Sequence, residues 1–405
     1  MQRTESRGRD RREQSFTRFR GSRFSLLVFC LVAVLALVGA GCGGDETGGD
    51  GGETAAVETG GGGGGDDLLA QAKADAEAAT GGVESFEEWS PGQAPAPKAG
   101  AKVGTVTCPH FIPACKQISD SLAEAGRALG WDVTSLDGGV DTPSQRAAVR
   151  SLVNANVDGM VLMGFGLDPI ADVLEEADQA GIAMVSEATP HSADLPIAGD
   201  VNIKGGFPAA GEQLGAWVAN DSGGEATILW FSADVNPGLI ERHEGFRDYL
   251  SQFDGIEFEP AEPIIVAEGD VGPKLQQQAV SVLQSHPEGS IDYVYACCDA
   301  WTTSIIEAAQ SLGRDELKMV SFDGAPQNIE FIRQGRNQVA DQATPWGWCG
   351  WLTMDQLNRV MQGEDFVDVG CPSKVLDSTN LPPEGEQWDG DIDYKAEFRK
   401  LWGVG

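Results

Sequence analysis

The sequence predicts an α/β protein made of two lobes, each with a parallel sheet. Short apolar runs rich in β-branched and aromatic residues alternate with segments whose apolar residues recur at helical spacing, from about residue 102 to residue 342. The helical segments are long enough to cross back over a sheet, which favours parallel pairing of the strands. A chain of 405 residues can bury more than one core, and the alternation is repeated after residue 203, so we expect two lobes.

The first lobe is expected at residues 101–203. Its strands are expected at 102–107, 131–136, 158–163 and 182–186. Apolar residues recur at helical spacing from Ile118 to Leu129, which predicts a helix between the first two strands. Thr142 directly before Pro143 marks the start of the next helix, because threonine caps a helix and proline is tolerated in its first turn.

The second lobe is expected at residues 204–342, where the same alternation returns. Its strands are expected at 226–231, 263–266, 291–296 and 319–322. Asn236 before Pro237 marks the beginning of one helix, and Gly313 marks the end of the helix that follows the third of these strands.

The first 41 residues have the pattern of a secretory signal peptide. Eight arginines precede residue 24, the apolar run from Phe24 to Val38 is 15 residues long, and small residues follow it. A run of this length is too short for an ordinary membrane-spanning helix. We therefore expect residues 1–41 to be removed and the mature protein to be exported.

Cys42 follows three small residues, an ending that resembles a bacterial lipobox. In such a site the cysteine is lipidated and becomes the first mature residue; the alternative is a plain cleaved signal that leaves Cys42 as a thiol. We favour a lipid anchor on the outer face of the cell membrane, because a glycine- and acid-rich tether follows at once. Residues 42–100 are expected to be this tether and a linker, with a short helix at residues 70–79. The folded body is expected to begin near Ala101.

The charge of the chain argues against nucleic acid as a partner. There are 62 acidic and 28 basic residues, and the net charge of −34 at pH 7 repels phosphate backbones and anionic lipid headgroups. We expect no cofactor, because no phosphate-binding loop is present, and no metal site, because the four histidines and the cysteines lack ligand spacing. No nucleophile and histidine have supporting spacing either, so an enzyme is not expected.

Six cysteines remain when those of the signal and the expected anchor are set aside. An even number in an exported protein favours disulfides. The disulfides expected are Cys108–Cys115, which brackets the first turn, and Cys349–Cys371. The adjacent Cys297 and Cys298 are left either as a strained vicinal disulfide or as free buried thiols.

Polar residues stand at three successive strand ends, as Cys298-Asp299, Asp323-Gly324 and Gln342. This run resembles the sugar-type periplasmic binding proteins of ABC transporters, and the resemblance covers about residues 102–363. It implies the type I periplasmic binding fold, in which two Rossmann-like lobes with parallel sheets are joined by a multi-strand hinge. It also implies that part of 343–375 returns to the first lobe and part of 376–405 to the second.

The resemblance implies a ligand site between the lobes. The residues implied in the second lobe and at the crossing are Arg242, Cys298, Asp299, Asp323 and Gln342. Arg242 opens an Arg-x-x-Gly-Phe motif, and its fork of donors suits hydroxyls or a carboxylate. Other roles stay open: Arg242 paired with Glu241 or Glu244 on the surface, and Asp299 as a helix cap. Asp323 alternatively serves only its turn, and Gln342 only the hinge.

The first lobe is implied to contribute His110 and Phe111, in the turn after its first strand, and Glu187 after its fourth. The ring of Phe111 would stack on the C–H face of a sugar, or else it belongs to the core. Many sugar binders carry asparagine after the third strand, where Gly164 stands here, and Asp-Arg in the region of Glu187. At least one lobe is therefore expected to hold its ligand differently.

The resemblance implies a monomeric solute-binding lipoprotein. It would capture a small polar ligand, a sugar or a polyol, by hinge closure and deliver it to an ABC permease. The alternative is a receptor of the same fold whose closed form signals to a membrane sensor. Every residue named above would serve both functions, so the sequence does not separate them.

Overall fold

The structure is a computed structural model that describes residues 63–233 and 236–405. The signal peptide expected at residues 1–41, the expected lipid anchor at Cys42 and the tether up to residue 62 lie outside the described residues. Within the described ranges, no helix combines the length and the apolar character needed to cross a membrane.

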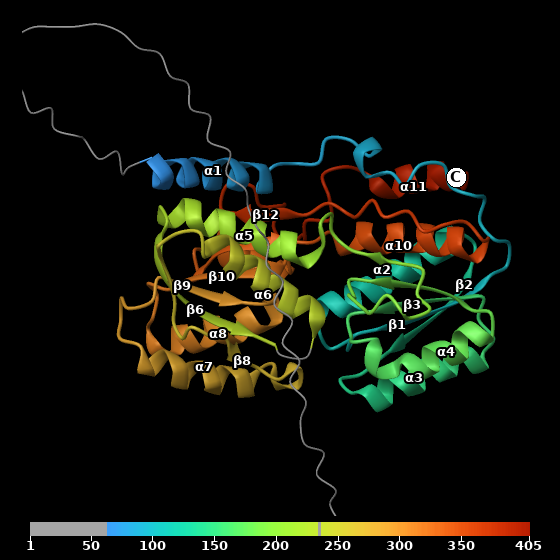
Figure 1. Ribbon diagram of the computed structural model, residues 1–405, viewed down its shortest axis with the longest axis horizontal. Coiled ribbons are helices and arrows are strands. Elements are labelled where there is room, and N and C mark those ends of the chain that lie inside the picture. The colour runs from blue at the N-terminus through green and yellow to red at the C-terminus, as the bar shows by residue number, and fades with distance from the viewer. Residues whose placement is uncertain (1–62, 234–235) are drawn as a thin grey trace, which may run out of the picture. The chain divides into compact units, whose positions relative to one another are not determined.

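The first lobe is a five-stranded sheet with only parallel pairings. Its strands are β1 (Lys102–Thr107), β2 (Asp132–Asp137), β3 (Gly159–Met163), β4 (Ala183–Glu187) and β5 (Asp200–Val201), in the order β2-β1-β3-β4-β5. Helices α3 (Thr142–Asn154) and α4 (Ala171–Gln179) cover one face, and α2 (Pro113–Ala128) and α10 (Trp346–Met361) cover the other (Figure 1). Because both faces are covered, β3 is buried along its whole length.

The second lobe contains the larger sheet, in the order β12-β11-β10-β9-β6-β7, with the short β8 beside β6. Its strands are β6 (Glu225–Ser232), β7 (Gly255–Phe258), β8 (Ile264–Ile265), β9 (Tyr293–Ala296), β10 (Lys318–Asp323), β11 (Gln338–Ala343) and β12 (Lys374–Asp377). Its helices are α5 (Gly206–Ser222), α6 (Pro237–Leu250), α7 (Pro273–Ser285), α8 (Asp299–Leu312) and α9 (Pro326–Arg333). Figure 1 shows α5 and α6 on one face and α7 and α8 on the other.

The predicted α/β fold with two parallel sheets is confirmed. The sequence analysis did not anticipate the edge strands β7 and β12, because a charged residue interrupts or flanks the few apolar residues of each, in GIEF and KVLD. β12 pairs with β11 in the antiparallel direction, whereas the other pairings of this sheet are parallel.

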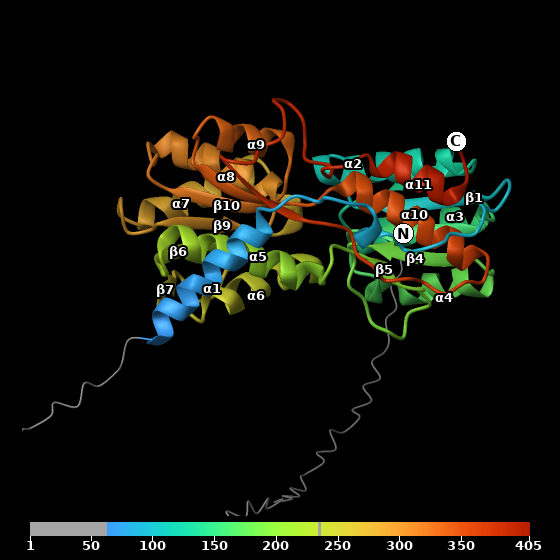
Figure 2. The ribbon, with the colours of Figure 1, turned by 90° about the horizontal axis from the view of Figure 1, so that it is seen from above.

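Several passages of chain join the lobes. They lie between β5 and α5, between β11 and α10, just before β12, and between β12 and α11 (Tyr394–Trp402). Ile203 of the first passage pairs with Cys371 of the third, and Cys371 forms a disulfide with Cys349 near the start of α10. Residues 378–388 stay beside the second lobe, where Arg333 donates to the carbonyl of Pro382, whereas α11 packs on α10 (Figure 2).

The expectation that residues 42–100 lie outside the folded body is wrong for residues 63–100, although the short helix expected at residues 70–79 is part of a longer one. Helix α1 (Gly63–Ala79) packs along α5, and Ala72 is completely buried there (Figure 2). Further on, the ring of Phe86 stacks on Trp348 of α10 at a centroid distance of 5.9 Å. The apolar residues of this segment are sparse in the sequence, and their partners come from elements more than 100 residues away.

Candidate functional site

A cavity of about 120 Å³ is lined by residues of both lobes. The first lobe contributes Cys108 after β1, Gly164 after β3 and Ala188 after β4. The second lobe contributes Cys298 after β9 and Asp323 at the end of β10. The strand order reverses between β1 and β3 in the first sheet and between β9 and β6 in the second, and β4 and β10 are the next strands along. Open parallel sheets bind their ligands at such places.

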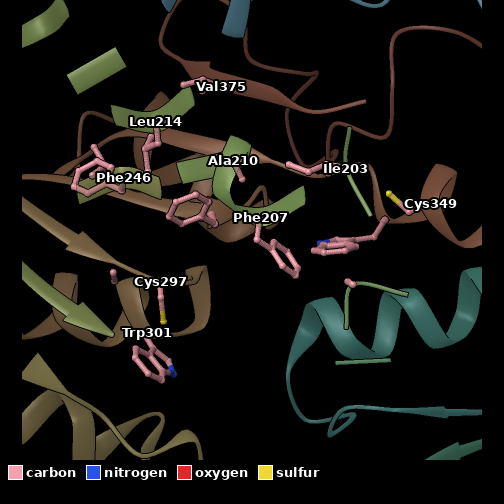
Figure 3. Packing of buried hydrophobic residues seen from close by; sticks show 14 of the residues in the cluster. Ile203, Phe207, Ala210, Leu214, Phe246, Cys297, Trp301, Cys349 and Val375 are labelled. Carbon is pink, nitrogen blue, oxygen red and sulfur yellow. The ribbon is translucent and has the colours of Figure 1, made fainter. Parts of the chain in front are cut away.

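Close packing of α5 against α6 holds Arg242 at this cavity. A Cβ atom built on Gly211 of α5 would lie 2.2 Å from the carbonyl oxygen of Arg242, and one built on Gly245 would lie 2.2 Å from that of Pro208. Only glycine allows the two helices to approach so closely. Figure 3 shows Phe207, Ala210 and Leu214 along α5, with Phe246 of α6 beside them.

Arg242 is buried, with 3% of its surface exposed, and it forms the polar centre of the cavity. Its Nη1 lies 3.0 Å from Asp323 Oδ1 and also donates to the carbonyl oxygen of Cys297 at 3.0 Å. The guanidinium lies between the rings of Phe207 and Phe322, at 4.8 and 5.0 Å from their centroids. The surface pairing of Arg242 with Glu241 or Glu244, which the sequence left open, is therefore wrong.

Asp323 combines burial with an uncommon backbone conformation. Its φ of +107° lies in the left-handed region, where a residue other than glycine is strained. Burial raises the pKa of Asp323, and the adjacent guanidinium of Arg242 acts in the opposite direction. Arg242 of α6 and Asp323 of β10 thus form an ion pair on the wall of the cavity. Asp323 therefore does not serve only its turn.

Asp299 lies behind this wall and does not line the cavity. Its carboxylate accepts hydrogen bonds from Ser321 Oγ and from the backbone N–H of Ala325, at 2.6 Å for the latter. Burial, followed by the neighbouring charge of Asp341, raises the pKa of Asp299 well above its ordinary value. Cys298 occupies the N-cap position of α8, so Asp299 is neither the cap nor a lining residue; it holds the turn after β10 in place.

Glu187 is completely buried at the end of β4 and does not line the cavity, although the next residue does. Its Oε2 accepts from Thr353 Oγ1 of α10 at 2.9 Å, and its Oε1 has no partner among the described residues. Burial raises the pKa of Glu187 to about 8, so the protonated form predominates at pH 7.

Gln342 is fully buried in β11, and its Nε2 donates to Gln213 Oε1 of α5 at 3.4 Å. It therefore lies at the crossing and away from the cavity lining. His110 and Phe111 do not line the cavity either. His110 Nε2 lies 2.9 Å from Thr107 Oγ1, while the ring of Phe111 is 63% exposed, so Phe111 is not part of the core.

The cavity also includes residues that the sequence did not single out for the site. Asn236 and Leu239 stand at the start of α6, and Trp346 stands at the start of α10 just after the crossing. Each follows the end of a strand of the second sheet by only a few residues. That position was the feature of the sequence that could have indicated a place on the cavity wall. They were missed because Asn236 was expected only to begin its helix, and because no motif marks Leu239 or Trp346.

Both expected disulfides are present, Cys108–Cys115 and Cys349–Cys371. Cys297 and Cys298 are free thiols, which decides between the two alternatives left open. Cys108, Cys115 and Cys298 line the cavity, so cysteines of both lobes contribute to its wall.

Gly164 explains why the first lobe departs from the pattern of sugar binders. Its φ is +76°, and a Cβ atom there would lie 2.8 Å from Cys108 Sγ. A side chain at this position would collide with the disulfide that follows β1. The position is therefore restricted to glycine, and the disulfide fills the space instead.

Comparison with known proteins places the chain in a family. A family model described as a periplasmic binding protein domain matches residues 112–365. The Ribose import binding protein RbsB of Escherichia coli (strain K12) is 23% identical over 268 residues, which is 65% of this chain and 84% of that protein.

Solved structures share the fold. A sugar ABC transporter protein from Yersinia enterocolitica matches with a TM-score of 0.66 and 19% identity, covering 77% of this chain and 98% of that one. An ABC transporter solute-binding protein from Bacillus halodurans, with bound myo-inositol, matches with a TM-score of 0.62 and 19% identity. The match covers 70% of this chain and 96% of that one.

The fold and the cavity between its lobes define a two-lobed solute-binding protein. The chain belongs to the periplasmic binding protein family. Proteins of this family act outside the cytoplasm and bind substrates for transport, and they are not enzymes.

Proposed function

We propose that this protein captures a small polar solute of the sugar or polyol class between its lobes and delivers it to an ABC permease. The observation that carries the proposal is the buried pair of Arg242 and Asp323 on the wall of a cavity lined by both lobes. The relatives support the chemical class, since one is named for ribose import and one structure holds myo-inositol.

Hinge closure is the proposed mechanism of capture. A ligand that touches both lobes stabilises the arrangement in which the lobes meet, because it gains contacts that neither lobe provides alone. A thermal-shift screen of sugars and polyols tests this, since a ligand that binds only the folded state raises the melting temperature. Small-angle scattering with and without the best ligand should show a more compact particle when it is bound. A ligand that binds with no change in scattering would contradict closure.

The permease partner is tested by deleting the gene. Loss of uptake of the ligand found in the screen is expected if the protein serves transport. Intact uptake combined with loss of a transcriptional response to the ligand would instead support a receptor that signals to a membrane sensor.

We also propose that Cys42 carries the lipid anchor and that the mature protein is a monomer on the outer face of the cell membrane. Two or more acyl chains are needed for stable attachment, so a diacylglyceryl group with an acylated amine is expected there. Mass spectrometry of the N-terminal peptide from native membranes tests the anchor, and an unmodified Cys42 would refute it. Sedimentation of the protein without residues 1–41 tests whether it is a monomer in solution, and a dimer would contradict this proposal.

A further inference from the structure

Two buried carboxyl groups stand behind the turn that follows β10. Asp299 is the first residue of α8 and Asp341 lies in β11, and they are 2% and 0% exposed. A hydrogen bond joins the two carboxyl groups. A carboxylate only accepts hydrogen bonds, so a bond between two carboxyl groups requires a proton on one of them.

Within residues 63–233 and 236–405, no cation forms an ion pair with either member of this carboxyl pair. The charged groups that face it are Asp323 of β10 and Arg242 of α6, and Arg242 is already in contact with Asp323. Two adjacent buried carboxylates without a cation repel each other strongly, because water does not screen them. Burial is the main cause that raises the pKa of both Asp299 and Asp341, which agrees with a proton held between them.

Each carboxyl group of the pair accepts a hydrogen bond from a backbone N–H of the turn. Asp341 Oδ1 accepts from Gly324 at 3.0 Å, and Asp299 Oδ2 accepts from Ala325 at 2.6 Å. These two donors directly follow Asp323, whose φ of +107° is strained. A strained backbone persists only where its surroundings hold it, and the two hydrogen bonds do so here. The carboxyl pair therefore fixes the backbone that carries Asp323 to the cavity wall.

The carboxyl pair is itself held by the sheet. The second oxygen of Asp341 accepts from Gln338 Nε2 at 3.1 Å, and that of Asp299 accepts from Ser321 Oγ. Gln338 Nε2 also donates to Ser321 Oγ at 3.0 Å, so β10 and β11 are joined behind the turn. All four carboxyl oxygens thus have a donor, and the shared proton completes the contact between the two groups.

We propose that Asp341 is a positioning residue of the ligand site. The proton that it shares with Asp299 allows both carboxyl groups to hold the turn of residues 323–325, and this turn keeps Asp323 on the wall of the cavity. Asp341 does not line the cavity, and it acts on the ligand only through the turn. The link to a ligand rests on the proposed function, whereas the hold on the turn is a property of the protein alone.

Hydrogen exchange followed by NMR tests the turn without any ligand, because the N–H groups of Gly324 and Ala325 are the donors. Asp341→Leu keeps a branched side chain and removes the acceptor, and both amides should exchange at least about tenfold faster. Ala325 is the decisive amide, since its acceptor is Asp299. Asp341→Asn keeps an acceptor for Gly324 and supplies an N–H in place of the shared proton, so both amides should exchange as in the parent protein. Unchanged exchange of Ala325 in Asp341→Leu would overturn the proposal.

The pH dependence of stability tests the shared proton. Because the pKa of Asp341 is raised in the fold, the folded state binds the extra proton, and the melting temperature of the parent protein should fall as the pH rises from 5.5 to 8. Asp341→Asn cannot bind this proton, so its melting temperature should fall less steeply. An equally steep fall, or faster exchange of Gly324 and Ala325 in Asp341→Asn, would overturn the proposal even if Asp341→Leu does not fold.

Calorimetry with D-ribose and myo-inositol connects the turn to the ligand. The probe that binds the parent protein should bind Asp341→Asn equally well and Asp341→Leu at least about fivefold more weakly. Asp355→Asn is the control, because Asp355 is equally buried but its partners Arg359 and Trp402 lie outside the cavity lining. It should lower the melting temperature and leave the affinity unchanged.

The outcomes separate the positioning role from the proposed function. Equal affinities of Asp341→Leu and the parent protein would overturn the positioning role, and the proposed function would stand. If neither probe binds the parent protein, the proposed function is contradicted, while the exchange of Ala325 and the pH dependence of Asp341→Asn still decide whether the carboxyl pair holds the turn.

Discussion

At the scale of single residues, burial decides the roles of the ionisable groups. Arg242, Glu187 and Asp299 are all more than nine-tenths buried, but only Arg242 has a charged partner in contact and lines the cavity. A buried carboxyl without a cation becomes neutral, whereas a guanidinium stays charged and needs its partner.

Breaking the buried ion pair should destabilise the fold strongly. Arg242→Met leaves Asp323 buried without a cation, and we expect a loss of about 3–5 kcal/mol in the free energy of unfolding, measured by urea titration. The double variant Arg242→Met with Asp323→Asn should recover part of it. Arg247→Met in the same helix is the control, because its pair with Asp248 is exposed and worth about 0–1 kcal/mol. If the loss of stability in the double variant equals the sum of the losses in Arg242→Met and Asp323→Asn alone, the two side chains are not coupled.

Glu187 should make the protein less stable as the pH rises. Its pKa is raised to about 8 in the fold, and it is close to 4.5 in the unfolded chain, so between these values the folded state binds the extra proton. The free energy of unfolding therefore falls with rising pH across this window, by up to about 1.4 kcal/mol per pH unit from this group.

The variant Glu187→Gln keeps the shape and stays neutral, so it should show a smaller fall in melting temperature between pH 5.5 and pH 8. The fall should not vanish, because burial also raises the pKa of Asp341, to about 7. Glu175→Gln on the exposed side of α4 is the matched control and should follow the parent protein. If the melting temperature of Glu187→Gln falls with pH as steeply as that of the parent protein, the Glu187 carboxyl is not the source of the pH dependence.

At the scale of elements, the crossing of α5 and α6 sets the position of the site. Gly245→Ala would place a methyl group 2.2 Å from the backbone oxygen of Pro208, so the helices must separate. We expect a loss of about 1–3 kcal/mol in the free energy of unfolding and weaker ligand binding. Gly65→Ala in α1 is the control: nothing lies within 4 Å of it, and it should be neutral or stabilising. Equal stability of both variants would contradict the close-packing argument.

Elements were predictable from the sequence wherever the signal is local. The strands β3 and β9 are continuous apolar runs. Asn236 before Pro237 does begin α6, and the Asn236 side chain accepts from the backbone N–H of Gly238. Whether a polar residue at a strand end faces the cavity is not a local property. Asp323 lines the cavity. Asp299 instead supports the turn behind it, because the packing of α8 against β10 points the Asp299 side chain toward that turn.

At the scale of the whole molecule, residues 63–100 bind to both lobes. Tyr249 of α6 donates to Asp75 of α1 at 2.7 Å, while Arg359 of α10 donates to the carbonyl oxygens of Gln93 and Gly92 at 2.9 and 3.1 Å. The segment therefore belongs to the folded body.

A chain that starts at residue 101 should be less stable than one that starts at residue 60, because it exposes the apolar surfaces of α5 and α10. We expect a difference of several kcal/mol in the free energy of unfolding, from the area that α1, Phe86 and Trp89 cover. Urea titration of the two proteins measures this. Equal midpoints would show that the segment adds nothing to the fold.

The same segment has a mechanical consequence. Val83 is held on the second lobe, since its N–H donates to Asp391 Oδ2 at 2.8 Å and Asp391 also binds Lys374 of β12. Phe86 is held on the first lobe by Trp348. Three residues reach at most about 10 Å, so the span from Val83 to Phe86 limits how far the two lobes can move apart.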